Sequence, residues 1–438
     1  MLSRLLNKGS ASDARTRTKP AGTLAPRHVT VAELKLLIPL RNFSEEELRA
    51  FSLTQKTETY GAGSILFQRN EKTDDSVLYL LSGSVEMRLR DTQRYEVTAG
   101  SAKARFPLSH GEIHRATAVA KSDIEVLRVS ARVMHKNLHA ELAEDRLLEP
   151  ENWDVPELLR TTPLFQTFCQ YFTSEELRLP TLPPVAVRLR RAIEREDIGI
   201  AEAAAIVQLD ATIAAKLLHI ANSPLYLQAQ PARNCLEAVK RLGLKATCNV
   251  VTSLCLKDLF KSRNKALQRR MQTLWHDSLR ISALSHVLAK ANRWADPEEA
   301  LLAGLLSDIG AFPFLVFVED FPKEHYSHEE VEAILAAVRG PVGYYVLKKW
   351  DFPEEIVQVP PLAEQWLYDS GPRLTLSDIV MLSRLHQHLE SGKTGQLPVI
   401  AAIPACHKLQ DGTLSPEYSL KVLHEAKTEI QEALTLLR

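Results

Sequence analysis

The spacing of apolar residues in this chain of 438 residues changes near Ser130. Before this point, short runs alternate apolar and polar side chains, as in SVEMRLR at 84–90, and turn residues such as Gly61 and Gly63 separate the runs. This two-residue period is typical of half-buried strands, and several such strands in succession predict an antiparallel β-barrel or jelly roll. After Ser130, apolar residues recur every three or four positions, which predicts helices. The chain is therefore predicted to be a multidomain α+β protein, with a β domain followed by an all-α region. The helical series includes Ile206, Leu209, Ile213, Leu217 and Ile220.

Domain boundaries follow from this change of period and from charged and proline-rich stretches. The first 27 residues hold six basic side chains and one acidic one, with small polar residues between them, which predicts a disordered tail. Ser44, three residues before Glu47, is predicted to cap a helix that precedes the strands. We expect a tail at 1–27, a β domain at 28–140, a helical linker at 141–176, a helical domain at 177–372, and C-terminal helices at 373–438 that complete it.

Composition restricts the kinds of partner and the compartment. Lysine plus arginine equals aspartate plus glutamate at 54 each, so net charge favours no class of partner. The five cysteines form no C-x-x-C pair, which predicts buried, reduced thiols and a cytoplasmic location. No uninterrupted apolar run approaches the roughly 18 residues of a membrane helix, so we expect no membrane association.

One stretch is strongly basic. Nine lysines and arginines but only one acidic residue, Asp258, lie between Lys240 and Arg270. The stretch lacks the interleaved aromatic residues on which single-stranded bases stack, so we expect no nucleic-acid partner. Two interpretations stay open: a solvated helix face, and a surface for an acidic protein.

The β domain resembles the cyclic-nucleotide-binding family. The matching segments are LIPLRNFSEEELRAF, YGAGSILFQRNEKTDDSVLYLLSGSVEMRLR and HRATAVAKSDIEVLRV. In that family a Phe-Gly-Glu turn opens a helix whose N–H groups hold the phosphate, and an arginine about nine residues later neutralises it. Here the run FPLSHGEIHRATAVA has Pro107 and Leu108 instead of Gly-Glu, and proline cannot donate an N–H. The candidate ligand contacts are Phe106, Ser109, Glu112, His114 and Arg115.

The helical region resembles the HDOD family, which is related to the HD-type phosphohydrolases. The resemblance rests on LPTLPPVAVRLRRAI, IVQLDATIAAKLLHIANSPLY, CLEAVKRLGLKATCNVV, LWHDSLRISALSHVLA and EEALLAGLLSDIGAF. Active HD enzymes hold divalent metal ions with a histidine, a His-Asp doublet and a later aspartate. Here the doublet position reads Ser307-Asp308, and the first histidine position is Asp277. Ala363 and Glu364 stand where related enzymes carry two histidines.

The resemblance therefore implies degenerate metal positions at Asp277, Ser307 and Asp308. One carboxylate cannot assemble a hydrolytic metal centre, so we expect no metal, no cofactor and no enzymatic activity. Asp308 is predicted to cap a helix or loop beside Gly310.

Together the two resemblances imply a bacterial signal-transduction protein whose HDOD domain binds other signalling proteins. The β domain is expected to be a sensor or an assembly scaffold that binds a nucleotide or other anion weakly, and a homodimer is an open alternative. A genuine cyclic-nucleotide sensor is the alternative function, and a metal-dependent phosphodiesterase is a third.

Overall fold

The computed structural model divides into two compact units, which we describe separately. The first unit contains residues 1–134 and 395–402, and the second contains 135–394 and 403–438. The described residues are 25–90, 93–110, 113–134, 143–179, 181–194, 198–223, 226, 230–256, 262–293, 296–391, 397–398 and 400–409. The predicted tail at 1–27 lies outside them except for its last three residues, and so does the part of the predicted C-terminal helices after residue 409.

The first unit begins with short helices and continues into strands. Helix α1 (Val31–Leu34) and the 3-10 turn η2 (Leu40–Asn42) precede α2 (Glu45–Thr54). As predicted, the Ser44 side chain accepts a hydrogen bond from the Glu47 backbone N–H, and the Glu47 carboxylate accepts one from the Ser44 N–H. This reciprocal pairing fixes where α2 begins.

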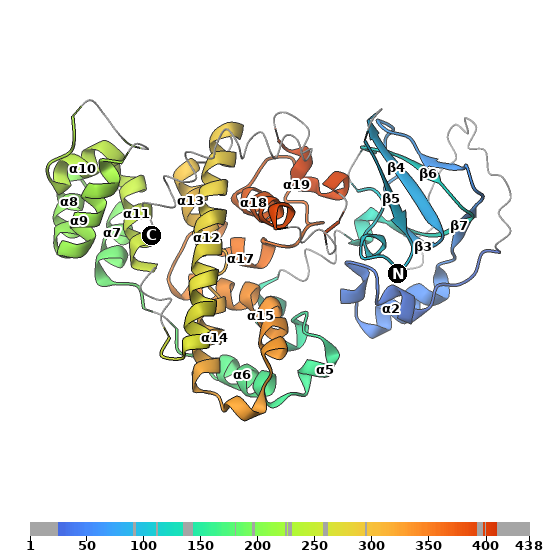
Figure 1. Ribbon diagram of the computed structural model, residues 1–438, viewed down its shortest axis with the longest axis horizontal. Coiled ribbons are helices and arrows are strands. Elements are labelled where there is room, and N and C mark those ends of the chain that lie inside the picture. Colours follow the sequence, from blue (N-terminus) through green and yellow to red (C-terminus); the bar gives the residue numbers. More distant parts are fainter. Residues whose placement is uncertain are drawn as a thin grey trace. The chain divides into compact units, whose positions relative to one another are not determined.

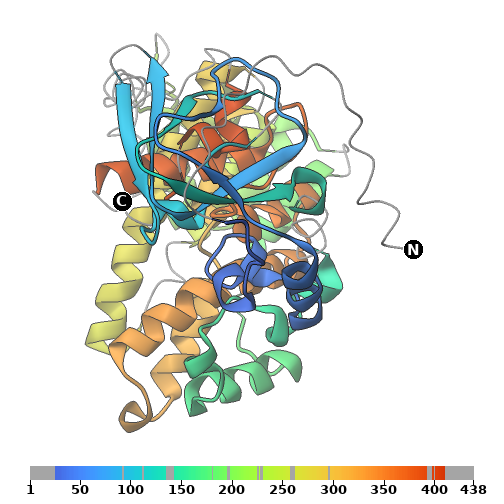
Figure 2. The same cartoon turned by 90° about the vertical axis from the view of Figure 1, so that its right-hand side faces the viewer.

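Among the described residues, seven strands form two antiparallel sheets in the first unit. The strands of this unit are drawn as arrows in Figures 1 and 2. One sheet has the order β1-β7-β3 and the other the order β2-β6-β4-β5. Alternation along β4 is as predicted, since Val85 and Met87 are fully buried while Glu86 and Arg88 are not. The strands are β1 (Glu58–Tyr60), β2 (Ile65–Phe67), β3 (Ser76–Ser82), β4 (Ser84–Arg90), β5 (Gln93–Thr98), β6 (Thr117–Ala120) and β7 (Ile124–Ser130).

The predicted antiparallel β domain is confirmed. Of the two forms predicted, a barrel or a jelly roll, the closed barrel is wrong, because the described strands form two separate sheets. No strand pairing joins the two sheets among the described residues. The pairing register of β3 shifts between Leu80 and Ser82, and Gly83 follows with a φ of 81°. This irregularity and the left-handed glycine carry the chain from one sheet into the other, so that the sheets remain separate layers.

The second unit contains two groups of helices, each with its own apolar cluster. The first lobe, as we call residues 184–256, consists of α7 (Pro184–Glu194), α8 (Ile200–Gln208), α9 (Ala211–Ala221), α10 (Cys235–Leu242) and α11 (Leu244–Leu256). It forms a separate group beside the long helix α12 in Figure 1. Gly243, with a φ of 83°, ends α10 and allows α11 to begin at the next residue.

The second lobe comprises the remaining helices of this unit. Its core lies between α12, α13, α14 and α15, and Trp153, Phe168 and Phe172 from the predicted linker pack into the same cluster. Helix α12, with 28 residues, is about 42 Å long. The helices are α4 (Glu144–Leu147), η4 (Pro150–Asn152), α5 (Glu157–Arg160), α6 (Pro163–Thr173), α12 (Lys265–Asn292), α13 (Pro297–Leu306), α14 (Ala311–Asp320), η6 (Lys323–His325), α15 (His328–Lys349), α16 (Glu354–Val357), α17 (Val359–Leu362), α18 (Leu376–Glu390) and α19 (Pro404–His407).

One stretch of the described chain, Pro297–Asp320, is long and apolar enough to cross a membrane. It comprises α13 and α14, and 89% of its most apolar window is buried inside the fold. Burial of this kind is typical of core helices, and the turn at 307–310 divides the stretch into two helices.

Candidate functional site

The predicted metal positions Ser307 and Asp308 lie in the turn between α13 and α14 and are buried. The Asp308 carboxylate lies 2.9 Å from Nη2 of Arg384, on α18, and 3.3 Å from Nη1 of Arg339, on α15. The same Nη2 of Arg384 donates to Ser307 Oγ at 3.0 Å. The doublet position therefore faces two guanidinium groups.

A second carboxylate, Glu364, completes this arrangement from the residues that follow α17. Arg339 Nη2 forms an ion pair with one of its oxygens, and Arg384 Nη1 lies 3.5 Å from the other. His388 Nε2 is 3.4 Å from Glu364 Oε1. We call Asp308, Arg339, Glu364 and Arg384 the arginine–carboxylate network, in which two positive charges balance two negative ones.

Both carboxyl groups of the network are held in the ionised form. Burial alone would raise the pKa of Asp308, but Arg384 and Arg339 outweigh it and hold that pKa below its ordinary value. Burial also opposes ionisation of Glu364, yet Arg339, the hydrogen bond to His388, and Arg384 hold its pKa well below the usual range. The network is therefore charged at neutral pH.

Close backbone packing holds the turn that carries Asp308. A Cβ atom on Gly310 would overlap the backbone of Arg339 and of Gly343, and one on Gly343 would lie 2.6 Å from Cβ of Pro360. Only glycine allows the start of α14, the middle of α15 and α17 to approach so closely. These contacts place Arg339 and Glu364 beside Asp308.

The predicted cap role of Asp308 is wrong. Helix α14 begins after Gly310 and has no side-chain cap, because the Asp308 carboxylate is directed to the two guanidinium groups. Asp277, the third predicted position, lies on α12 and accepts a hydrogen bond from Gln387 Nε2 at 2.9 Å. Gln387 lies one turn beyond Arg384 on α18, so Asp277 faces the neighbouring turn of that helix.

The residues present do not fit a divalent metal ion. Within the described ranges, no three or more His, Cys, Asp or Glu side chains lie close enough to hold one. The carboxylate oxygens already face guanidinium groups, whose positive charge would repel a cation. The sequence prediction missed Arg339 and Arg384, although Arg384 interrupts the otherwise apolar run IVMLSRL with a charge, a sign of a buried ion pair.

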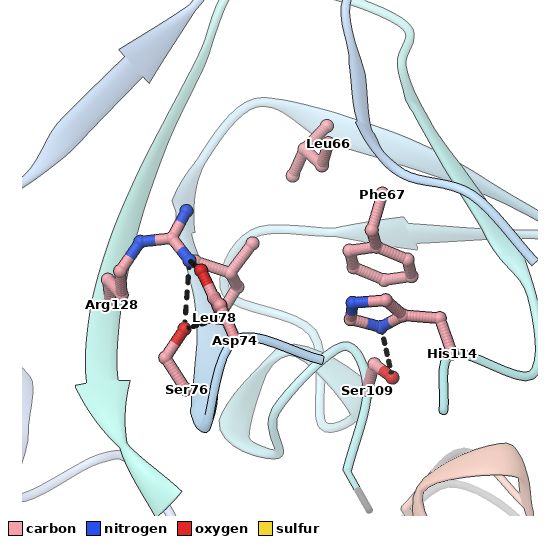
Figure 3. Close-up of a pocket in the computed structure, with 8 residues that line it drawn as sticks. All are labelled: Leu66, Phe67, Asp74, Ser76, Leu78, Ser109, His114 and Arg128. Carbon is pink, nitrogen blue, oxygen red and sulfur yellow. Dashed lines mark hydrogen bonds and ion pairs between the residues drawn. The ribbon is translucent and has the colours of Figure 1, made fainter. Parts of the chain in front are cut away.

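The first unit has a small pocket between its sheets (Figure 3). Its cavity volume is about 10 Å³, close to the space of one water molecule. The lining residues are Leu66, Phe67, Asp74, Ser76, Leu78, Ser109, His114 and Arg128.

The charged wall of this pocket is Arg128, from β7, which the sequence prediction did not identify. Arg128 Nε lies 2.7 Å from Glu58, and Nη1 lies 2.8 Å from both Asp74 and Ser76 Oγ. The guanidinium is therefore neutralised by two carboxylates of the same chain. It offers little unbalanced charge to an anionic ligand.

The opposite wall contains two of the predicted ligand residues. His114 stacks on Phe67 with ring centroids 4.1 Å apart, and its Nδ1 is 2.9 Å from Ser109 Oγ. Phe106 is buried in the core of the unit, and Arg115 is half-buried outside the pocket lining. The structure thus brings Ser109 and His114 together but not Phe106 or Arg115, and Glu112 lies outside the described residues.

Comparisons with known proteins identify two domains in the chain. Residues 179–364 match the HDOD domain, and residues 57–140 match the cyclic nucleotide-binding domain. An uncharacterized protein of Treponema pallidum (strain Nichols) is 26% identical over 229 residues, which are 48% of this chain and 41% of that protein. The chain therefore matches less than half the length of this relative.

Several solved structures are similar to parts of this chain. An HDOD domain protein of Geobacter sulfurreducens has a TM-score of 0.48 at 23% identity, covering 62% of this chain and 97% of its own. A Shewanella amazonensis SB2B protein, whose name assigns it provisionally to the metal-dependent phosphohydrolases, has a TM-score of 0.49 at 27% identity, covering 60% and 97%. A cyclic nucleotide-binding-like protein of Brucella abortus has a TM-score of 0.20 at 20% identity, covering 25% and 97%.

Proposed function

Because the chain combines a cyclic nucleotide-binding domain with an HDOD domain, we propose that it is a non-catalytic regulatory protein. The observation that supports this most is the arginine–carboxylate network. Hydrolysis of a phosphoester by an HD-type centre requires a metal ion that activates water. At Asp308 two guanidinium groups lie where such a centre would need metal ligands.

We infer that the HDOD domain acts through contacts with other signalling proteins. A rigid, charge-balanced centre can support the fold around it without chemistry, and the outer helices then provide surfaces for binding. The location that we propose is the cytoplasm, on the basis of the free cysteines Cys169, Cys235, Cys248, Cys255 and Cys406.

For the first unit we propose a role in assembly, or as a weak sensor of an anion. The pocket has space for about one water molecule, and its arginine is already neutralised by Glu58 and Asp74. A cyclic nucleotide would require the Phe67–His114 stack to open and the carboxylates to move away. These features favour a scaffold over a genuine cyclic-nucleotide sensor.

The test is a hydrolysis assay on the full chain. We expect no turnover of cyclic dinucleotides or p-nitrophenyl phosphate in the presence of Mg²⁺, Mn²⁺ or Fe²⁺, and no stoichiometric metal in the purified protein by mass spectrometry. A known HD-type phosphodiesterase assayed in parallel is the positive control. Metal-dependent turnover that disappears in Asp308→Asn would contradict the proposal.

A further inference from the structure

The two lobes of the second unit have separate apolar cores. The cluster of the first lobe contains residues of α7 to α11, while that of the second lobe contains residues of α4, α6 and α12 to α16. Two residues of the first lobe contact the second cluster: Leu256, at the end of α11, belongs to it, and Val187 on α7 packs against it. Because the other residues of each cluster come from one lobe, the seam between the lobes depends on polar contacts as well as on these apolar ones.

Polar contacts are prominent at this seam, beside the packing of α11 against α13. Tyr226 donates a hydrogen bond to Glu298, at 2.9 Å from each carboxylate oxygen, and Lys245 lies 3.2 Å from Glu299. Polar contacts of this kind can be exchanged for water, so opening this seam costs less than opening an apolar core.

Arg190 on α7 is the most buried charge at the seam, with 7% of its surface exposed. Its Nη2 donates to the backbone carbonyl of Trp350, and its guanidinium carbon lies 4.3 Å from the centre of the Phe352 ring. Nε faces Glu194 at 3.4 Å but has no hydrogen-bond partner among the described residues. The first lobe thus places the Arg190 guanidinium against the 350–352 turn of the second lobe.

That turn lies in the chain between two residues of the arginine–carboxylate network, Arg339 and Glu364. Trp350 ends α15, Asp351 has a φ of 64°, and Phe352 leads into α16. The last carbonyls of a helix lack intrahelical partners and carry partial negative charge, which attracts a cation. Arg339 lies earlier on α15, and Glu364 follows α17, so the chain on either side of the turn leads to the network.

From this geometry we propose that Arg190 is a latch between the lobes. In the closed state it holds the first lobe against the 350–352 turn. When it is released, the first lobe turns about the contact of α11 with α13 while both apolar cores remain intact. The incomplete hydrogen bonding of Arg190 keeps the closed state only moderately favoured, as a two-state regulatory element requires. The inference rests on the proposed regulatory function, to which it adds a conformational change, but the test of the latch requires no partner protein.

The test is hydrogen exchange measured by mass spectrometry on the full chain. In Arg190→Ala, amides in 350–357 should exchange about tenfold faster or more, since the turn loses a hydrogen bond from a charged group. Amides in the middle of α9 and α12 should keep their wild-type protection. Arg191→Ala, on the exposed adjacent residue, is the matched control and should leave exchange in 350–357 unchanged.

A second variant covers the case in which Arg190→Ala does not fold. Phe352→Leu keeps an apolar side chain but removes the ring under the guanidinium, and it should accelerate the same amides by a smaller factor. Unchanged exchange in 350–357 in a folded Arg190→Ala protein would overturn the latch. Loss of protection throughout α7–α11 would also overturn it, because Arg190 would then stabilise the lobe itself. Detection of metal-dependent hydrolysis would contradict the proposed function, but it would not change the outcome of the hydrogen-exchange test.

Discussion

His386 on α18 is a buried histidine with no hydrogen-bond partner for either ring nitrogen in the described part of the chain. Burial lowers its pKa to about 4, so the folded protein holds the neutral ring. The unfolded chain binds a proton near pH 6.5, and the folded state does not until near pH 4. Stability due to this group is therefore complete above pH 6.5 and declines as pH falls towards 4.

We expect the free energy of unfolding to fall by about 2 kcal/mol between pH 6.5 and 5 because of His386. Urea denaturation at a series of pH values measures this change. In His386→Leu the decline over this interval should largely disappear, whereas in His325→Leu, which removes an exposed histidine, it should persist. An unchanged pH slope in His386→Leu would show that another group is responsible.

Substitution of Asp308 should show how much the arginine–carboxylate network contributes to the free energy of unfolding. Asp308→Ala leaves the guanidinium of Arg384, whose side chain is 4% exposed, without its nearest carboxylate. Removing one partner of a buried ion pair costs about 3–5 kcal/mol, and we expect this decrease in the free energy of unfolding. Adding Arg384→Leu should recover at least half of it, as urea denaturation can measure. A free energy of unfolding of Asp308→Ala within about 1 kcal/mol of the wild-type value would contradict a stabilising role of the network.

The surrounding motifs assign Ser307, Asp308 and Asp277 to the metal positions of the family that the chain resembles, and this assignment stays a prediction. The side chains that these residues contact could not be predicted from sequence. Asp308, Arg339 and Arg384 are separated by 31 and 45 residues along the chain, and the helical period does not show which buried charges meet. The cap prediction for Asp308 failed for the same reason, since local preference is outweighed by a distant guanidinium.

At the scale of elements, the packing of α14, α15 and α17 depends on glycine. In Gly310→Ala the new methyl would overlap the backbone of Arg339 and Gly343, which cannot rotate away. We expect a loss of at least about 2 kcal/mol in the free energy of unfolding. Gly199→Ala is the matched control, since the added methyl meets nothing within 4 Å, and its effect should stay within about 1 kcal/mol. Equal effects of the two substitutions would show that the close packing is not required.

The pocket between the sheets gives a second expectation at this scale. Isothermal titration calorimetry of the full chain with cyclic AMP or cyclic GMP should give a dissociation constant no tighter than the high micromolar range. Two or three charge-assisted bonds are lost when Arg128 is already neutralised and Pro107 cannot donate, at about 1.5–3 kcal/mol each. A submicromolar constant that Arg128→Ala abolishes would refute this, with Arg115→Ala as the comparison.

The antiparallel strands and the helices could be predicted from the period of apolar residues, because that period reports which side chains face a core. Barrel closure could not be predicted, since it depends on whether distant edges pair. The shift at Leu80 and Ser82 is a local irregularity that the alternating pattern does not show. The sequence predicted helices in the linker at 141–176, but it did not show that they would join the core of the second lobe. Their apolar residues pack on segments more than a hundred residues away along the chain.

At the scale of the whole molecule, the described residues of the basic stretch do not form one surface. Lys245 pairs with Glu299 at the start of α13, which lies near the end of α12, whereas Arg270 pairs with Glu332 near the start of α12. The length of α12, about 42 Å, separates these two ends. A single small partner therefore cannot contact both groups of basic residues.

We expect charge reversal at the two ends to act independently on partner binding. The variant Arg263→Glu, Lys265→Glu, Arg269→Glu changes exposed residues at one end, and Arg233→Glu, Lys240→Glu changes exposed residues on the first lobe. Capture of a given acidic partner should weaken in one variant only, and the loss should shrink as salt rises. Equal losses in both variants would contradict the separation, and thermal denaturation should show both proteins folded.

The charge-balanced centre also has an evolutionary consequence. Metal chemistry at this centre would require replacement of both Arg339 and Arg384 and the introduction of histidines. Any first substitution leaves a buried charge unpaired, at a cost of about 3–5 kcal/mol. Because a domain has a net stability of only about 5–15 kcal/mol, such intermediates would be selected against. If the proposed non-catalytic function is correct, single mutations at the network should therefore lower stability before they could introduce metal chemistry.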